Sequence, residues 1–232
     1  MKHRINIRGV MIPNDYKWYY DYFGEDSTCP ADVQKIIDAF NAGDEIEVYI
    51  NSPGGVIDVG SEIYTMLREK RENVNIYITG EACSAASIVA MAGHCEMSPT
   101  ALMMVHCVSS RMSGNHRDME HMAAVLSTAD KALSTAYMEK TGMSQHDVLK
   151  MMEAETWLTA AQAKEKGMVD AVMFEEKDTA DPLVASVGFR LPSIEQMDAV
   201  KNMLKQAGSE SRDSAFLMQA RLNLLKMRGE QR

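Results

Sequence analysis

A serine among small residues and a histidine further along the chain have types and spacing that could do chemistry. Ser84 follows the apolar stretch 76–78 and precedes the run 88–92, which is apolar enough for a buried helix. A serine on such a strand-to-helix turn has an exposed hydroxyl at a helix N-terminus, where free backbone N–H groups face the atom that its oxygen attacks. His106 ends a second apolar stretch, 102–105, and would accept the hydroxyl proton. The pair predicts nucleophilic catalysis by a serine.

Each of these residues also has a purely structural interpretation. A serine in a small-residue turn is more often structural than nucleophilic, and a lone histidine at a strand end is more often a satisfied core residue. Ser87 is a rival nucleophile, but it lies one helical turn further on, where a hydroxyl bonds a backbone carbonyl. The context of strand, turn and helix therefore favours Ser84.

A catalytic histidine needs an acceptor that fixes its tautomer. The acidic candidates downstream are Glu153, Glu155 and Asp170. Glu155 stands just before residues 157–159 in a predicted loop, from which its side chain is free to turn toward the sheet.

Two consecutive glycines, Gly54 and Gly55, follow the apolar stretch 46–50. Paired glycines let backbone N–H groups approach a ligand closely, and an oxyanion hole is built in this way. A phosphate cradle is the other use of such a pair. However, no Gly-Lys-Ser/Thr follows and no GxGxxG is present, so nucleotide binding is only weakly indicated.

The dipeptides His94-Cys95 and His106-Cys107 form a doubled pair of metal-ligating types. Their separation matches no standard zinc spacing. We expect neither a metal nor another cofactor.

The composition excludes several classes of partner. The chain has 232 residues and a formal net charge of −9, which argues against nucleic acid or an anionic membrane as the main partner. No apolar run reaches the ~18 residues of a membrane span, and no apolar segment typical of a secretory signal follows the basic start. Four cysteines without framework spacing suit a reducing compartment. We expect a cytoplasmic protein of one domain, with a tail.

Strand and helix patterns alternate along the chain, with strands expected at 5–10, 46–50, 74–78, 102–106 and 169–173 and helices at 31–41, 57–67, 84–93, 117–140, 144–152 and 160–166. This order predicts an α/β domain with a largely parallel sheet and right-handed crossovers. Sites in such sheets lie at the carboxyl ends of the strands, where 51–55, 80–84 and His106 fall. The aromatic stretch 13–30 is either a covering loop or a contact surface.

The long helix expected at 117–140 carries apolar residues three and four apart along a narrow seam. From the pattern alone, it either projects and pairs with a copy of itself or packs on its own sheet. Beyond residue 175 the chain becomes more polar, with amphipathic stretches at 194–207 and 215–228. This tail is either disordered, an assembly arm or an element that docks a partner.

Several motifs together resemble the proteolytic subunit of the ATP-dependent Clp protease. They are Ile50-Asn51-Ser52-Pro53-Gly54-Gly55-Val56, the Gly80 to Ser84 spacing, Ala92-Gly93 and Met104-Val105-His106. Within that family, the short start and the segment 155–159 are most similar to phage-borne, Clp-related head maturation proteases. The resemblance covers roughly residues 5–174 and implies the α/β ClpP/crotonase-type fold, with repeated β-β-α units, a projecting handle helix and a helical C-terminal tail. We therefore expect a protease domain over 1–174 and an extension over 175–232.

The resemblance also implies the roles of individual residues. Ser84 would be the nucleophile and His106 the base, with the backbone N–H groups of Gly55 and Ala85 as the oxyanion hole. The family's third catalytic residue is an aspartate, and the matching position here holds Glu155. A glutamate can orient the histidine in the same way, but its extra methylene requires a shifted backbone or a different rotamer.

The family assembles as seven-membered rings stacked in pairs, which hydrolyse protein and peptide substrates inside a chamber. The helix at 117–140 occupies the position of the ring-to-ring handle, which favours the projecting interpretation. The family's axial N-terminal segment, which contacts the unfoldase, has no counterpart before Ile5. The resemblance therefore supports a partnership with an ATP-dependent unfoldase less strongly than it supports peptide hydrolysis.

Three functions follow as hypotheses. The first is a serine endopeptidase that forms an acyl-enzyme on Ser84. The second is a non-catalytic assembly protein on the same fold, which the glutamate at position 155 suggests and which would not react with serine-directed probes. The third is acyl-CoA chemistry of the crotonase type, in which acyl-CoA should raise the melting temperature.

Overall fold

The computed structural model of the chain describes residues 1–175 and residue 198. Internal contacts divide the chain into two units, Met1–Lys177 and Asp178–Arg232. Apart from Asp198, the predicted tail helices at 194–207 and 215–228 lie outside the described residues. The predicted domain boundary at residues 174/175 therefore stays a prediction.

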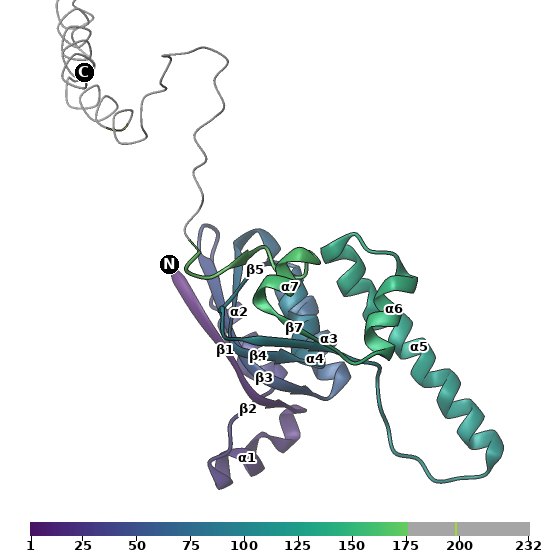
Figure 1. Ribbon diagram of the computed structural model, residues 1–232. Helices are drawn as coiled ribbons and strands as arrows, with labels where there is room; N and C mark the ends of the chain where they lie inside the picture. Colours follow the sequence, from purple (N-terminus) through teal and green to yellow (C-terminus); the bar gives the residue numbers. More distant parts are fainter. Residues whose placement is uncertain (176–197, 199–232) are drawn as a thin grey trace, which may run out of the picture. The chain divides into compact units, whose positions relative to one another are not determined.

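The first unit is built on one eight-stranded sheet with the order β2-β1-β3-β4-β5-β8, while β6 pairs with β4 and β7 pairs with β6 (Figure 1). The strands are β1 (Lys2–Met11), β2 (Ser27–Thr28), β3 (Glu45–Gly55), β4 (Val74–Cys83), β5 (His94–Met97), β6 (Leu102–Val105), β7 (Thr156–Thr159) and β8 (Ala171–Val172). Every pair is parallel except β6 with β7. This confirms the predicted α/β class with a mainly parallel sheet.

The sheet divides along β4. Residues 75–78 of β4 pair with β5, whereas residues 81–83 pair with β6. Because β6 takes over at the carboxyl end of β4, the end of β6 comes to lie beside the end of β4. The predicted convergence of 80–84 and His106 depends on this pairing.

The helices of residues 1–175 are α1 (Lys17–Phe23), α2 (Pro30–Ile37), α3 (Ile57–Arg68), α4 (Ala85–Val89), α5 (His116–Thr141), α6 (Gln145–Glu153) and α7 (Ala160–Glu165), with 3-10 turns at Asn14–Tyr16, Arg71–Asn73 and Ala90–Ala92. Capping explains several boundaries. The Asn115 side chain accepts from the N–H groups of Arg117 and Asp118 at the start of α5, and Ser144 caps α6 in the same way.

The core lies between one face of the sheet and helices α3 and α4. Alternate residues of β3 and β4 point to this face and are buried, because side chains of a strand alternate between its two sides. They are Ile46, Val48, Ile50, Val74, Ile76 and Ile78. Ile63 and Leu67 of α3 are buried in the same cluster, and every residue of α4 is buried. The predicted buried helix after Ser84 is confirmed.

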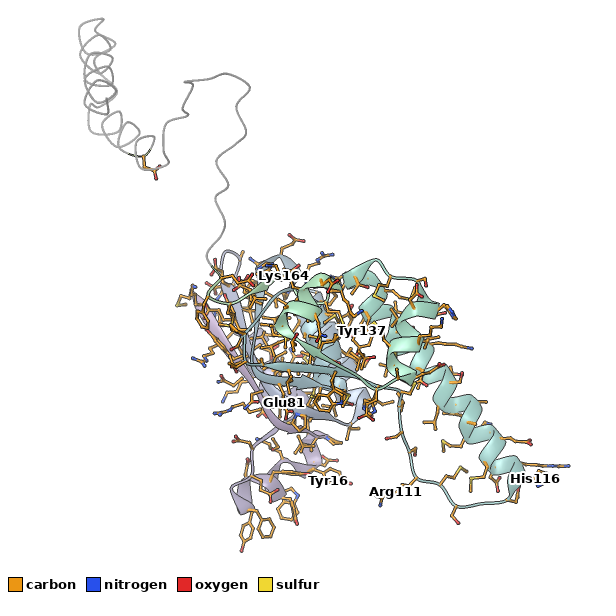
Figure 2. The ribbon with its side chains drawn as sticks, viewed as in Figure 1. Tyr16, Glu81, Arg111, His116, Tyr137 and Lys164 are labelled. Atoms are coloured by element: carbon orange, nitrogen blue, oxygen red, sulfur yellow. The ribbon has the colours of Figure 1, made fainter. Side chains whose placement is uncertain are left out.

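The long helix α5 begins away from the rest of the domain and ends beside α6 (Figures 1 and 2). No side chain between His116 and Leu133 is buried, whereas Ser134, Ala136 and Tyr137 are. The first part of α5 therefore projects, and the last part packs on the domain beside α4 and α6. One part of the helix thus projects and the other packs on its own domain, while pairing of the projecting part with a copy of the chain stays a prediction.

The aromatic stretch at 13–30 contains α1, a helix that the sequence pattern did not predict. Tyr16, Trp18, Tyr19, Tyr22 and Phe23 are all exposed. A covering loop would bury such rings, so the structure favours the contact-surface interpretation of this stretch. None of the helices in the described part of the chain combines the length and the apolar character that crossing a bilayer requires.

Candidate active site

Ser84 occupies the turn between β4 and α4 in a backbone conformation that is unusual for a residue with a side chain. Its φ is 54° and its ψ is −127°, outside the regions that L-residues favour. The turn is held on one side by the N–H of Ser84, which donates to the carbonyl of Met104 in β6 at 2.9 Å. Strain of this kind persists only where the surroundings over-determine it, and it clusters at functional sites.

Gly54, near the end of β3, lies directly against the turn at Ser84 and supports it. A Cβ at Gly54 would lie 2.5 Å from the carbonyl oxygen of Cys83, 2.7 Å from Cβ of Ser84 and 3.0 Å from the nitrogen of Ala85. Only a glycine leaves room for the turn at this distance, and its φ of +92° also favours glycine. The end of β3 is thus packed directly against the start of α4.

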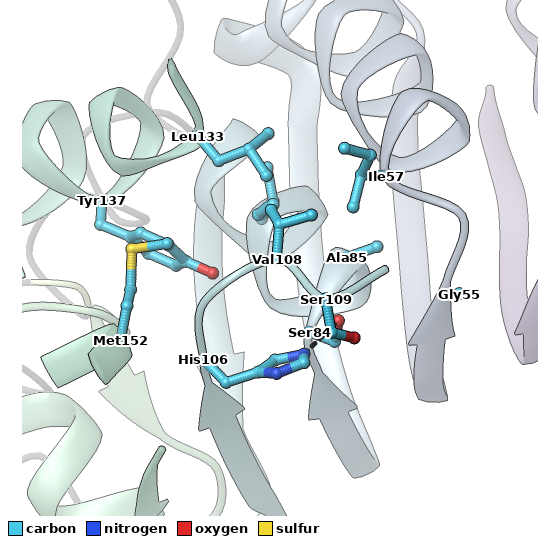
Figure 3. A pocket seen from close by; sticks show the side chains of 11 residues that line it. Gly55, Ile57, Ser84, Ala85, His106, Val108, Ser109, Leu133, Tyr137 and Met152 are labelled. Carbon is cyan, nitrogen blue, oxygen red and sulfur yellow. Dashed lines mark hydrogen bonds between the residues drawn. The ribbon is translucent and has the colours of Figure 1, made fainter. Parts of the chain in front are cut away.

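His106 directly follows β6 and reaches Ser84 across the β4–β6 pairing. Its Nε2 lies 2.8 Å from Ser84 Oγ (Figure 3). Because Cys83 pairs with Met104, Ser84 and His106 both come to lie at the carboxyl end of the β4–β6 pair. In the tautomer with its proton on Nδ1, His106 accepts the hydroxyl hydrogen of Ser84, as a general base must.

The predicted oxyanion-hole residues line the same pocket as Ser84 and His106. Gly55 ends β3 and Ala85 begins α4, and both border the cavity above the serine (Figure 3). Ser52 positions the glycine pair: its hydroxyl, fully buried, donates to the carbonyl of Gly9 at 2.6 Å and accepts from the N–H of Gly54 at 3.1 Å. These two bonds hold the backbone of the glycine pair in place. A neighbouring N–H group on a backbone held in this way, such as that of Gly55, can stabilise a developing oxyanion.

Glu155 is placed in the turn between α6 and β7, with a φ of +46°. Its Oε1 accepts from the indole Nε1 of Trp157 at 3.4 Å. Within residues 1–175, no hydrogen bond joins Glu155 to His106. Its role as the third catalytic residue therefore stays a prediction.

The other acidic candidates are placed differently. Asp170 accepts from the N–H of Cys95 at 2.7 Å and from Lys140 Nζ at 2.5 Å, near the amino end of β5. Although burial works in the opposite direction, these bonds lower the pKa of Asp170. That end of the sheet is opposite to the one that carries Ser84, so Asp170 is used in a structural ion pair. Glu153 is an exposed residue at the end of α6.

Asp130 of α5 is a supporting residue that the sequence analysis missed. Its Oδ1 accepts from the N–H of Val108 at 2.7 Å, and so ties the segment after His106 to the helix. Burial, and then the nearby Asp130 carboxylate, raise the pKa of the Cys107 thiol to about 11. The sequence pattern of the long helix gives no signal for this role, because the partner of Asp130 lies outside the helix.

Ser87, the rival nucleophile, is fully buried, and its hydroxyl donates to the carbonyl of Ser84 at 2.6 Å. This is the bond expected for a serine one turn inside a helix. Within residues 1–175, no group of three or more histidine, cysteine or acidic side chains is placed to hold a metal ion.

The arrangement at the carboxyl edge of the sheet suits acyl transfer: a hydroxyl bonded to an imidazole, at a helix N-terminus and beside a glycine pair. Comparison with known families agrees with this chemistry. A family model described as Clp protease matches residues 33–176, which is more than half of the chain. The matched span includes Gly55, Ser84, His106 and Glu155.

Proposed function

Because the chain belongs to the Clp protease family, we propose that it is a serine endopeptidase that hydrolyses peptide bonds through an acyl-enzyme on Ser84. The observation that carries the proposal is the 2.8 Å contact between Ser84 Oγ and His106 Nε2 on a strand-to-helix turn. Members of the family act as oligomers on protein substrates.

In the proposed reaction, Ser84 Oγ attacks the peptide carbonyl carbon while His106 Nε2 takes the hydroxyl proton. The N–H groups of Gly55 and Ala85 stabilise the oxyanion of the tetrahedral intermediate. His106 then gives the proton to the leaving amine, and the acyl group stays on Ser84 as an ester. In the second half of the reaction, His106 takes a proton from a water molecule, whose oxygen attacks the ester carbonyl carbon. His106 then returns the proton to Ser84 Oγ as the ester bond breaks and the carboxylic acid product leaves.

The experiment that tests the proposal is intact mass spectrometry after treatment with a fluorophosphonate probe, followed by peptide mapping. We expect one adduct on Ser84 of the wild type and none on Ser84→Ala. An adduct at another residue, or no adduct on the wild type, would contradict the proposed nucleophile. The second result would instead favour the alternative of a non-catalytic assembly protein.

We propose that Glu155 orients His106 after its side chain turns from Trp157 toward the imidazole. Glu155→Gln should then lower kcat by roughly a hundredfold or more, because the amide favours the wrong tautomer of the histidine. Glu153→Gln, two residues earlier and exposed, is the matched control and should remain within about twofold of the wild type. Peptidase kinetics on both variants checks this expectation, and a rate for Glu155→Gln within about twofold of the wild type would remove Glu155 from the mechanism.

We also propose that the projecting part of α5 joins copies of the chain, in the ring or double ring that the resemblance implies. Its seam of Met119, Met122 and Leu126 finds no buried position within the described unit. Leu126→Glu places a charge on this seam and should shift the protein to smaller species in light scattering, whereas Ser127→Glu on the exposed flank should not. A cytoplasmic location, a phage head maturation role and an unfoldase partner remain predictions.

A further inference from the structure

Tyr137 lies near the carboxyl end of α5 and is one of the residues that line the pocket of Ser84 and His106 (Figure 3). Tyr137 Oη is 2.7 Å from Ser87 Oγ, which is 2.6 Å from the carbonyl oxygen of Ser84. Tyr137 is 3% exposed and Ser87 is 0% exposed. We infer that Tyr137 and Ser87 are positioning residues that aim the N–H of Ala85 into the oxyanion hole, an inference that rests on the proposed peptidase function.

The direction of this hydrogen-bond chain follows from what each group can donate. A carbonyl oxygen only accepts, so Ser87 uses its single hydroxyl proton on Ser84. Ser87 Oγ must then accept from Tyr137. Burial raises the pKa of Tyr137, which keeps the phenol protonated and able to donate. The chain therefore runs from Tyr137 through Ser87 to the carbonyl of Ser84.

The carbonyl of Ser84 and the N–H of Ala85 belong to the same peptide unit. Because a trans peptide is planar, its C=O and N–H point in opposite directions, and fixing one fixes the other. The backbone N–H of Ser87 also donates to this carbonyl, at 2.9 Å. Two donors on one side of the peptide thus set the direction of the N–H on its other side. Hydrogen bonds to the carbonyl also polarise the amide and strengthen its N–H as a donor.

The backbone of Ser84 makes such support necessary. At a φ of 54° and a ψ of −127°, the residue is outside the favoured regions and would relax if its peptide were released. Tyr137 comes from α5, whereas Ser87 and Ala85 belong to α4. The buried end of α5 thereby holds the turn at Ser84 in place through the hydroxyl groups of Tyr137 and Ser87.

Tyr137→Phe removes the phenol oxygen and keeps the ring. We expect kcat for a fluorogenic peptide to fall about tenfold with KM unchanged, because the oxyanion forms only after binding. The affinity for a peptide aldehyde, whose hemiacetal on Ser84 places an oxygen in the hole, should fall by a similar factor. Tyr64→Phe is the matched control: its hydroxyl lies 3.5 Å from Glu139 of α5, and it should change neither value more than twofold.

Ser87→Ala should lower kcat at least as much as Tyr137→Phe, because Ser87 bonds the carbonyl of Ser84 directly. It should also lower the melting temperature, because it leaves the Tyr137 hydroxyl buried without its acceptor. The double variant should show the kcat of Ser87→Ala, because Tyr137 acts only through Ser87. It should also recover part of the melting temperature, because no buried phenol hydroxyl is left without an acceptor. Ser134→Ala, another buried helical serine whose hydroxyl bonds a backbone carbonyl, is the control.

The outcomes separate this inference from the proposed function. An active wild type with a Tyr137→Phe variant that matches Tyr64→Phe in kcat and aldehyde affinity would overturn the inference alone. A loss of kcat without a loss of aldehyde affinity would do the same, because it would place the effect outside the oxyanion hole. A wild type that neither hydrolyses peptides nor takes the fluorophosphonate would overturn the proposed function, and the inference with it.

Discussion

Ser84→Ala is expected to lower kcat/KM for peptide hydrolysis by roughly a thousandfold or more, with fold and assembly unchanged. The substitution removes the atom that forms the acyl-enzyme, so the remaining rate comes from binding and the oxyanion hole alone. The stability cost should be small, because the residue is only partly buried and its backbone bonds stay. Steady-state hydrolysis of a fluorogenic peptide, with circular dichroism and light scattering on the same samples, checks all three expectations.

Two further variants make this result specific. His106→Ala should cause a loss of similar size, because base and nucleophile act as a unit and their losses do not add. Ser109→Ala removes another serine that borders the pocket and should stay within about twofold of the wild type. Hydrolysis that survives Ser84→Ala would show that a different group carries the reaction. A wild type as inactive as the variant would favour the non-catalytic assembly protein.

The central part of the site could be predicted because its signals are local. The apolar stretch before Ser84, the small residues around it and the buried run after it specify a strand, a tight turn and a helix. A parallel sheet brings the carboxyl ends of its strands together, so the sequence predicts that His106 lies near Ser84. The 2.8 Å contact between their side chains agrees with that expectation.

Short elements and side-chain directions could not be predicted in the same way. Strands β5 and β7 have four residues each and, unlike the equally short but wholly apolar β6, they mix polar and apolar residues, so neither gives a clear pattern. They form because β4 and β6 offer free edges. The direction of the Glu155 carboxylate depends on a positive φ and on the neighbouring Trp157 indole. Asp130 and Tyr137 act on the site only through the packing of α5, which sequence spacing does not reveal.

Gly54→Ala is expected to have the second large effect, on stability and activity together. The new Cβ would overlap the carbonyl oxygen of Cys83 at 2.5 Å and Cβ of Ser84 at 2.7 Å. Both atoms belong to the strained turn, which cannot yield without moving the nucleophile or the N–H of Ala85. We expect the free energy of unfolding to fall by roughly 2–5 kcal/mol from the clash and the positive φ together.

The activity of the folded Gly54→Ala protein should fall by roughly a hundredfold or more. A displacement of about 1 Å in a reacting group costs this much, and here the nucleophile and one oxyanion donor shift together. Peptidase assays well below the melting temperature, corrected for the folded fraction, measure the loss. The fluorophosphonate reaction with Ser84 should slow in parallel.

Gly43→Ala separates the two causes. Gly43 has a φ of +91°, almost the same as the +92° of Gly54, but a Cβ there would have no atom within 4 Å. Its alanine variant should therefore carry only the backbone strain, about 1–2 kcal/mol, with unchanged kcat. The difference between the two variants isolates the contact between the end of β3 and the start of α4. Equal stabilities and an active Gly54→Ala enzyme would mean that this contact does not hold Ser84 in place.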